Sequence, residues 1–226
     1  MPSSAVSTIG TLMWSNTGPA RVQREINTAM HMRSVNGEPV DRGFKLWLID
    51  ESWSNLCAEI EGPPGSPYEG GVFVVKILVP DTYPVVPPKV EFRTRIWHPN
   101  VSPESGAIGL NILGKAWSPD MSLRTILMAV RNIIAIPDMA TPFDDDVTRQ
   151  YSQRHELFVR TAKHWTHRYA NGPNCIPEFD AKIQTLMDLG MYESLARSTL
   201  SKKDWHVDKV CHNFSSLKRA SSEERA

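Results

Sequence analysis

Apolar and polar positions change their period along the chain, and each change predicts an element. Residues 44–48 and 56–60 alternate apolar with polar side chains, which predicts two half-buried strands. Residues 72–79 are apolar at nearly every position, as expected of a strand in the middle of a sheet. Val90 and Phe92 alternate inward from a fourth strand over 89–93. Four strands in succession indicate an antiparallel meander.

Helical periodicity stands on both sides of these strands. Val22, Ile26 and Ala29 fall on one face of a predicted helix over 20–32. After the strands, apolar residues spaced i, i+3, i+4, i+7 predict a long helix that covers the sheet. These residues are Leu123, Ile126, Leu127, Val130, Ile133 and Ile134. Two further helices, 146–153 and 155–169, lead to the helix stop Asn171-Gly172-Pro173. The fold class is therefore α+β.

Beyond this stop the pattern changes to three short helical segments. The first ends at Gly190 and the second at Leu200. The third carries apolar residues at helical spacing: Val207, Val210, Cys211 and Phe214. We therefore expect a main domain over 20–170, a linker over 171–176 and a small three-helix bundle over 177–217, which is a marginal size for a domain.

Composition limits the classes of partner. The chain has 25 basic and 25 acidic side chains, so its net charge suggests neither nucleic acid nor an anionic membrane as a partner. Residues 1–19 are polar, lack a signal pattern and are expected to form a disordered tail, as are residues 218–226. The most apolar helical stretch, 126–136, is interrupted by Arg131 and is too short to span a bilayer.

The three cysteines, Cys57, Cys175 and Cys211, are an odd number at wide spacing. They form neither a disulfide framework nor a metal box, which fits a cytoplasmic or nuclear protein. His164 and His167 are three residues apart on a predicted helix, a spacing that can hold a metal. No third ligand accompanies them, so we expect a solvated helix face, no metal site and no cofactor.

Four spaced motifs occur in a fixed order. They are Pro67-Tyr68-Glu69-Gly70-Gly71, then Tyr83-Pro84-Val85-Val86-Pro87-Pro88-Lys89-Val90, then Trp97-His98-Pro99-Asn100, then Trp117-Ser118-Pro119. With the order of helices and strands, these motifs resemble the ubiquitin-conjugating fold over residues 20–170. Residues 177–217 resemble a ubiquitin-associated domain, whose Met-Gly-Phe loop corresponds to Leu189-Gly190-Met191.

The resemblance implies an acyl-transfer site that lacks its reacting atom. Members of that family carry ubiquitin as a thioester on the cysteine of an Ile-Cys-Leu-Asp-Ile segment. This chain reads Ile108-Gly109-Leu110-Asn111-Ile112, so glycine occupies the place of the nucleophile. A thiol with a free pKa of about 8.5 is a strong nucleophile as its thiolate, and glycine offers no atom for the bond. Residues 97–117 contain no cysteine that could replace it.

Other positions of the implied site also depart from the family pattern. Asn111 replaces an aspartate, and the family's acidic Asp-Asp-Pro segment aligns with residues 140–142, while residues 144–146 are acidic in a different register. The resemblance assigns Asn100 an oxyanion-stabilising role, which has no use without a thioester. We expect Asn100 to bond the backbone of its own turn and His98 to brace the loop.

Two surfaces remain for binding. The resemblance places Val85, Ser118 and Pro119 on a ligase-facing surface, although the prolines could equally serve only to shape their loops. In the small domain, Leu189, Gly190, Met191 and Phe214 correspond to a patch that binds ubiquitin. Small apolar contacts of this kind give weak affinity.

Three hypotheses of function follow. The leading one is a non-catalytic protein of the ubiquitin pathway that binds ubiquitin, a ligase, an activating enzyme or an active conjugating enzyme. The second is an active ubiquitin-conjugating enzyme whose cysteine has been replaced by Gly109 in this sequence. The third is a structural subunit without ubiquitin contact.

Overall fold

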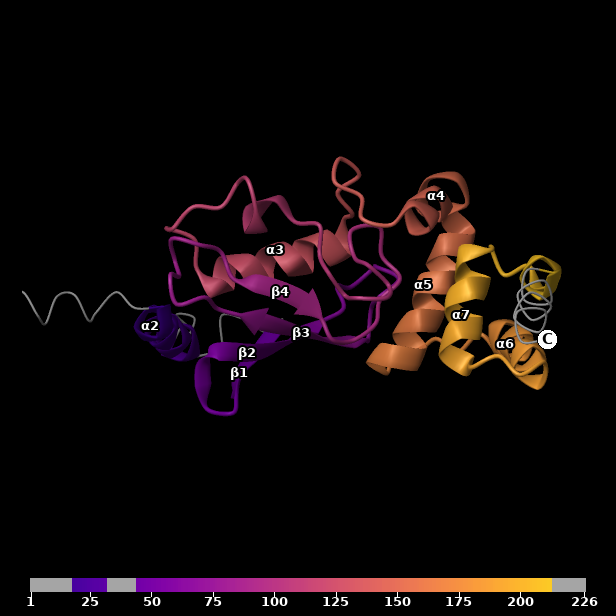
Figure 1. Ribbon diagram of the computed structural model, residues 1–226, viewed down its shortest axis with the longest axis horizontal. Helices are drawn as coiled ribbons and strands as arrows, with labels where there is room; N and C mark the ends of the chain where they lie inside the picture. Colours follow the sequence, from indigo (N-terminus) through magenta and orange to yellow (C-terminus); the bar gives the residue numbers. More distant parts are fainter. Residues whose placement is uncertain (1–17, 32–43, 213–226) are drawn as a thin grey trace, which may run out of the picture.

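The computed structural model describes residues 18–31 and 44–212 of the chain. The described part is elongated, with α2 (Gly18–His31) at one end and the C-terminal helices at the other (Figure 1). Within the described residues, no helix combines the length and apolarity needed to cross a membrane.

Four strands form one antiparallel sheet in sequence order, as the alternation predicts. They are β1 (Phe44–Ile49), β2 (Ser52–Glu61), β3 (Val72–Leu78) and β4 (Lys89–Phe92). The register aligns Ala58 of β2 with Val75 of β3, and Val75 with Phe92 of β4. These three side chains are buried, so one row across the sheet belongs to the core. The predicted meander is confirmed.

The long helix α3 (Leu123–Ala135) packs on this core together with α2. All six apolar residues that predicted its buried face are buried. Ser122 caps the helix, because its side chain accepts a hydrogen bond from the backbone N–H of Thr125 at 3.2 Å. Helix α2 begins two residues earlier than predicted and buries Val22 and Ile26 as expected.

Two further helices, α4 (Asp145–Gln153) and α5 (His155–Ala170), complete the main body. Helix α5 ends at Asn171, which adopts the left-handed conformation with φ 57°. Its Phe158 and Trp165 side chains are buried in the same core as the sheet. The fold class predicted from the sequence is therefore confirmed.

The C-terminal segment contains α6 (Pro177–Asp188), α7 (Glu193–Lys202) and a helical stretch over 207–212 that reaches the end of the described residues. Its own core contains Phe179, Leu186, Leu200 and Trp205. The boundaries of the tails, linker and small domain stay predictions, and Phe214 lies outside the described residues.

Candidate functional site

The segment before Gly109 is folded into a compact loop. The backbone pairs His98 with Val101, and Val101 with Ile108. The N–H of Gly109 then donates to the carbonyl of Asn100 at 2.8 Å. These bonds place Gly109 beside the turn that contains His98 and Asn100.

His98 is fully buried and both of its ring nitrogens are occupied. The Nε2–H donates to the carbonyl of Ile133 at 2.9 Å, and Nδ1 accepts the backbone N–H of Asn100 at 3.0 Å. Burial lowers the pKa of His98 to about 4, although the bond to the Ile133 carbonyl opposes this shift. The ring is therefore neutral near pH 7 and holds the end of α3 to the loop.

Asn100 is also buried, and its side chain fastens the loop that follows α3. Its Nδ2 donates to the carbonyls of Asp138 and Thr141, each at 2.7 Å, and its Oδ1 accepts the N–H of Asp138 at 2.9 Å. The sequence had suggested that the Asn100 amide bonds the backbone of its own turn. Instead it bonds residues about forty positions away. Both of its amide hydrogens are already donated.

The backbone of Gly109 does not require glycine. Its φ lies outside the left-handed region that side chains avoid. A Cβ added there would lie 3.1 Å from the carbonyl oxygen of Thr141, 3.6 Å from the Phe143 ring and 3.7 Å from the carbonyl oxygen of Asn100. A side chain therefore fits if the Thr141 carbonyl moves by a few tenths of an ångström.

Thr141 belongs to the segment that aligned with the family's acidic residues, so this neutral segment does lie next to Gly109. In the acidic run over residues 144–146, the first residue has a structural role. Asp144 caps α4, with its Oδ1 accepting the N–H of Val147 at 3.0 Å. Asn111 is exposed and begins a short 3₁₀ turn.

The rim of this loop is apolar. The side chains of Ile136, Met139 and Phe143 are exposed. The Phe143 ring lies 3.6 Å from the position that a Cβ on Gly109 would take, and the Phe143 N–H donates to the Pro99 carbonyl at 2.7 Å.

The three cysteines lie in other elements. Cys57 is buried in β2, and burial raises the pKa of its thiol. Cys175 is exposed between α5 and α6, and Cys211 is half-buried in the helical stretch after α7. None of the three belongs to the segment 97–117.

The structure brings the two predicted ligase-facing loops together. The indole Nε1–H of Trp117 donates to the carbonyl of Pro84 at 2.9 Å, which joins the loop of Val85 to the loop of Ser118 and Pro119. Val85 is 72% exposed, so its side chain is available on the surface.

A half-buried carboxylate on α2, Glu25, supports both loops, and no pattern in the sequence had singled it out. Glu25 accepts the N–H of Leu123 at 2.7 Å and the hydroxyl of Tyr83 at 3.0 Å. An acidic residue in the middle of an amphipathic helix gives no local sign of this role, because Tyr83 and Leu123 are 58 and 98 residues away, while its local partner Arg21 forms an ordinary i,i+4 pair.

Of the residues predicted to bind ubiquitin in the C-terminal segment, Leu189 is exposed and Met191 is not. Met191 is only 6% exposed and packs in the domain core, so its side chain is not on the surface. Gly190 makes the turn with φ 89°. The exposed apolar side chains around this turn are Met187, Leu189, Tyr192 and Leu195, which we call the 187–195 patch.

His164 is buried, contrary to the expected solvated face. Its Nε2 accepts a hydrogen bond from Nε of Arg197 at 3.1 Å, and its ring packs edge-on against Phe179 and Trp205. Within the described ranges, no three His, Cys, Asp or Glu side chains gather in a group that could hold a metal.

Comparisons with known proteins identify the family to which this fold belongs. The sequence model of the family described as "Ubiquitin-conjugating enzyme" matches residues 21–166. The chain belongs to the ubiquitin-conjugating enzyme family.

Relatives align along most of the chain. It is 44% identical over 196 residues to "Ubiquitin-conjugating enzyme E2-22 kDa" of Drosophila melanogaster, covering 87% of this chain and 96% of the relative. It is 39% identical over 194 residues to the human "Ubiquitin-conjugating enzyme E2 K", which covers 86% of this chain and 95% of the relative. The solved E2 domain of a Toxoplasma gondii ubiquitin conjugating enzyme is similar at 37% identity with a TM-score of 0.60, covering 67% of this chain and 98% of that one.

Proposed function

We propose that this protein acts in the ubiquitin pathway as a conjugating-type fold without conjugating activity. The observation that carries the proposal is Gly109, which stands where the family forms its thioester. A thioester needs a sulfur atom at this position, and no other residue of the segment 97–117 supplies one.

The groups around Gly109 support this proposal, because their polar atoms are already used within the fold. His98 is neutral and bonded at both nitrogens, and Asn100 donates both amide hydrogens to backbone carbonyls. The hydroxyl of Ser102 accepts the N–H of Ser105 at 3.1 Å. The Ser102 hydroxyl also donates to Oε2 of Glu104, but this bond is long at 3.5 Å, and Oε1 of the same carboxylate is paired with Lys202 at 2.6 Å.

The remaining function is binding. The exposed Val85 with Ser118 and Pro119 suits a ligase, an activating enzyme or an active conjugating enzyme as partner. The 187–195 patch is small and apolar, which suits a weak contact with a small folded protein, and ubiquitin is the partner we propose for it. The protein would then regulate or scaffold an active relative.

The second candidate is an active enzyme whose cysteine is substituted in this sequence. The specific observation in its favour is the backbone of Gly109, which accommodates a Cβ with little movement. The names of the relatives, which are ubiquitin-conjugating enzymes, point in the same direction.

Thioester charging tests the proposal directly. The chain is incubated with activating enzyme, ATP and ubiquitin, and analysed on a non-reducing gel beside Gly109→Cys and Gly109→Cys/Asn111→Asp. Ser105→Cys is the matched control, since it places a thiol on the same exposed loop but away from position 109. We expect no reducible adduct for the chain as it stands or for the control.

Each outcome has a distinct meaning. An adduct on the unmodified chain would mean that another thiol carries ubiquitin, and the proposal would be wrong. Charging of Gly109→Cys alone would show that the surface for the activating enzyme is intact. If neither Gly109→Cys nor Gly109→Cys/Asn111→Asp forms an adduct, binding is the only function left to test.

Ubiquitin binding is tested separately by titrating ubiquitin into the isotope-labelled full chain. We expect weak, saturable shifts of the amides around the 187–195 patch, and Leu195→Asp should abolish them. An absence of shifts anywhere would favour a structural subunit without ubiquitin contact.

A further inference from the structure

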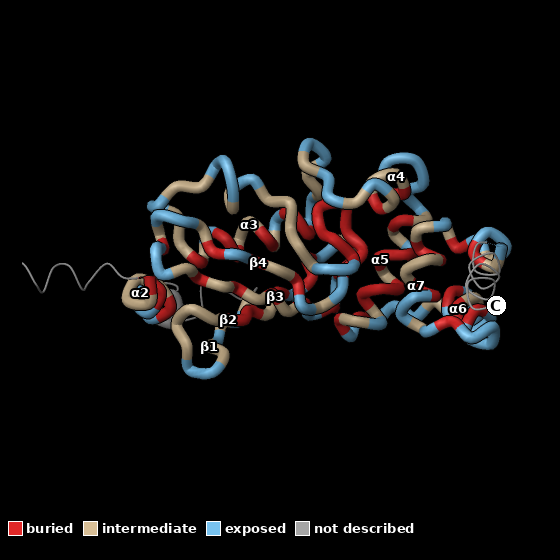
Figure 2. Tube along the Cα trace, in the orientation of Figure 1, coloured by how far each residue is buried: buried red, intermediate tan, exposed pale blue. Residues whose placement is uncertain are grey.

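Helix α5 is shared between the two cores of the molecule. Its Phe158 and Trp165 pack in the core of the sheet, while Leu157 packs against the core of the C-terminal segment. Helix α7 lies along α5 (Figure 1), and both helices carry buried stretches at this contact (Figure 2). The two predicted domains therefore meet along a helix and are joined by more than a linker.

Indole groups tie the two sides together through buried hydrogen bonds. The Nε1–H of Trp165 donates to the hydroxyl of Ser201 at 2.9 Å, and that of Trp205 donates to the hydroxyl of Thr161 at 2.9 Å. The Trp205 ring stacks on Phe179, with ring centres 3.6 Å apart and planes within 6°. Because buried indole N–H groups are costly to leave unpaired, these bonds favour one arrangement of α7 on α5.

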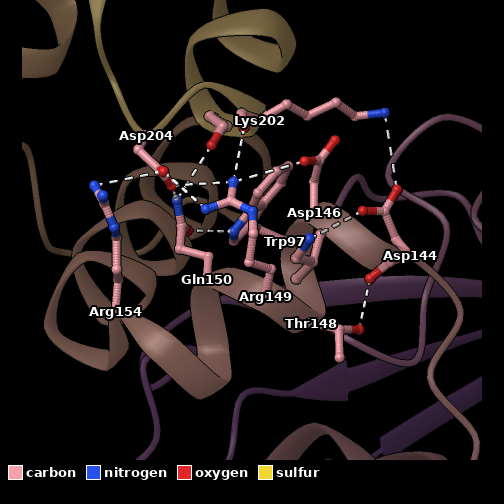
Figure 3. Close-up of polar contacts among 11 residues, drawn as sticks. Trp97, Asp144, Asp146, Thr148, Arg149, Gln150, Arg154, Lys202 and Asp204 are labelled. Carbon is pink, nitrogen blue, oxygen red and sulfur yellow. Dashed lines mark hydrogen bonds and ion pairs between the residues drawn. The ribbon is translucent and has the colours of Figure 1, made fainter.

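Gln150 of α4 connects this contact to the candidate site. Its side chain is fully buried. Its Oε1 accepts the Nε1–H of Trp97 at 2.8 Å, and its Nε2 donates to the carbonyl of Ser201 and to Oδ1 of Asp204, each at 3.2 Å (Figure 3). Trp97 immediately precedes His98, so one amide group bonds both the loop of Gly109 and the turn after α7.

Charged groups surround this amide. Asp204 pairs with Arg149 at 2.8 Å and with Arg154 at 3.5 Å (Figure 3). Lys202 reaches across to Glu104, at 2.6 Å, and to Asp144, at 3.8 Å. Glu104 lies in the loop between Asn100 and Gly109, so the small domain contacts the candidate site on this flank.

The turn that makes these contacts has an unusual backbone. Asp204 and Trp205 are consecutive residues in the left-handed region, with φ 53° and φ 61°. Residues other than glycine adopt this region uncommonly, and surrounding contacts then stabilise it. Here the backbone N–H of Trp205 donates to the Leu200 carbonyl at 2.7 Å within the same segment, and the two side chains also bond Arg149, Gln150 and Thr161 of the main domain.

We propose that the small domain is docked on the main domain in a single orientation, with Gln150 as the positioning residue. The 187–195 patch and the surface around Gly109 are consequently presented together, at a fixed distance and angle, to one partner or one assembly. This inference goes beyond the proposed function, since it holds whichever partner each surface binds.

Residual dipolar couplings of the isotope-labelled full chain test the docking. Amides of the sheet and α3 report the orientation of the main domain, and amides of α6 and α7 report that of the small domain. We expect both sets to fit one alignment tensor in the unmodified protein. Two different tensors in that protein would overturn the proposal without any variant.

The Gln150→Glu variant tests the role of the amide. The new carboxylate would still accept the Trp97 indole N–H, but it would face the Asp204 carboxylate and the Ser201 carbonyl. We expect two separate tensors and a shorter rotational correlation time for the small domain. Gln153→Glu is the matched control, because it adds the same charge at an exposed position of α4 and should keep one tensor.

One tensor in Gln150→Glu would show that the amide does not position the domain. If that variant does not fold, Asp204→Lys takes its place, since it changes only the small-domain side and sets a cation against Arg149 and Arg154. Two tensors in Asp204→Lys support the proposal, and one tensor overturns it.

Discussion

The loop of Gly109 and the junction at Gln150 both contain buried polar side chains, but they use them differently. In the loop, His98 and Asn100 bond backbone groups of their own domain and leave an apolar rim outside. At the junction, Gln150 bonds a tryptophan on one side and, on the other, Ser201 of α7 and Asp204 of the turn after it. The first set of bonds holds one loop, and the second connects that loop to the C-terminal segment.

This difference between the loop and the junction shows which side chains can be changed without breaking hydrogen bonds that hold the fold. A cysteine at position 109 would extend from the loop toward Thr141 and Phe143, and none of the bonds that hold the loop passes through that side chain. Exchange between cysteine and glycine at position 109 would therefore change the chemistry of the loop and leave its hydrogen bonds intact. Loss of the Gln150 amide would leave the buried indole N–H of Trp97 without its acceptor and would remove one donor from the Ser201 carbonyl and from Asp204.

The largest expected effect is on the junction. Trp205→Ala removes a 3% exposed ring from its stack on Phe179 and leaves a cavity, so we expect the free energy of unfolding to fall by about 3–5 kcal/mol. Tyr192→Ala removes an 82% exposed ring and should change it by less than about 0.5 kcal/mol. Urea unfolding of both variants measures the difference, and equal costs would mean that the junction contributes little to stability.

The next effect concerns the loop. Asn100→Asp keeps the shape of the side chain but points a carboxylate oxygen at the carbonyls of Asp138 and Thr141, so we expect a loss of about 3 kcal/mol. Asn111→Asp makes the same chemical change at an exposed position and should cost less than about 0.5 kcal/mol. Thermal melts compare the two, and an unchanged melting temperature for Asn100→Asp would show that the loop is held by other contacts.

Acid should act through the buried histidine of the loop. Burial lowers the pKa of His98 to about 4, against about 6.5 in the unfolded chain, so the unfolded state takes up the proton first as pH falls. The corresponding stability is present above about pH 6.5 and is lost toward pH 4, which amounts to about 2 kcal/mol between pH 7 and pH 5.

His98→Gln provides the control for that prediction. Urea midpoints measured at pH 7 and pH 5 should differ less in the variant than in the unmodified chain, even though its stability at pH 7 is lower. An equal pH dependence in the two proteins would assign the effect to other groups, such as His164, whose pKa burial also lowers to about 4.

The smallest effect is expected at the edge of the junction. Lys202 is partly exposed, and its ion pair with Glu104 lies near solvent. Lys202→Ala should therefore cost less than about 1 kcal/mol, and added salt should reduce the difference from the unmodified chain. A larger loss that persists in high salt would place this ion pair among the contacts that determine docking.

Much of the fold could be predicted because its signals are local. The alternation of Leu46 and Leu48, the apolar run of β3 and the i, i+3, i+4 spacing of α3 each depend only on neighbouring residues. The motif Trp97-His98-Pro99-Asn100 likewise placed the candidate loop. The absence of a sulfur atom at position 109 follows from the sequence alone, because the residue there is glycine.

The rest depends on contacts between distant elements. His164 and His167 on α5 suggested a solvated face, because periodicity cannot show that a second helix covers His164. Met191 was placed on a surface by resemblance, although its side chain packs inward beside the turn. The sequence around Gln150 does not predict its role, because a glutamine in a polar helix can hydrogen-bond water or a tryptophan without any change in the neighbouring residues.

The sharing of α5 between two cores also bears on how the chain is made. Synthesis proceeds from the N-terminus, and domains generally fold as they emerge. Helix α3 and one side of α5 can pack on the sheet once residue 170 has been synthesised and has emerged. The opposite side of α5 remains exposed to solvent until Ser201 and Trp205 are available to cover it. While residues 171–205 are being added, the nascent protein exposes a strip of α5 that α7 and the turn after it cover later.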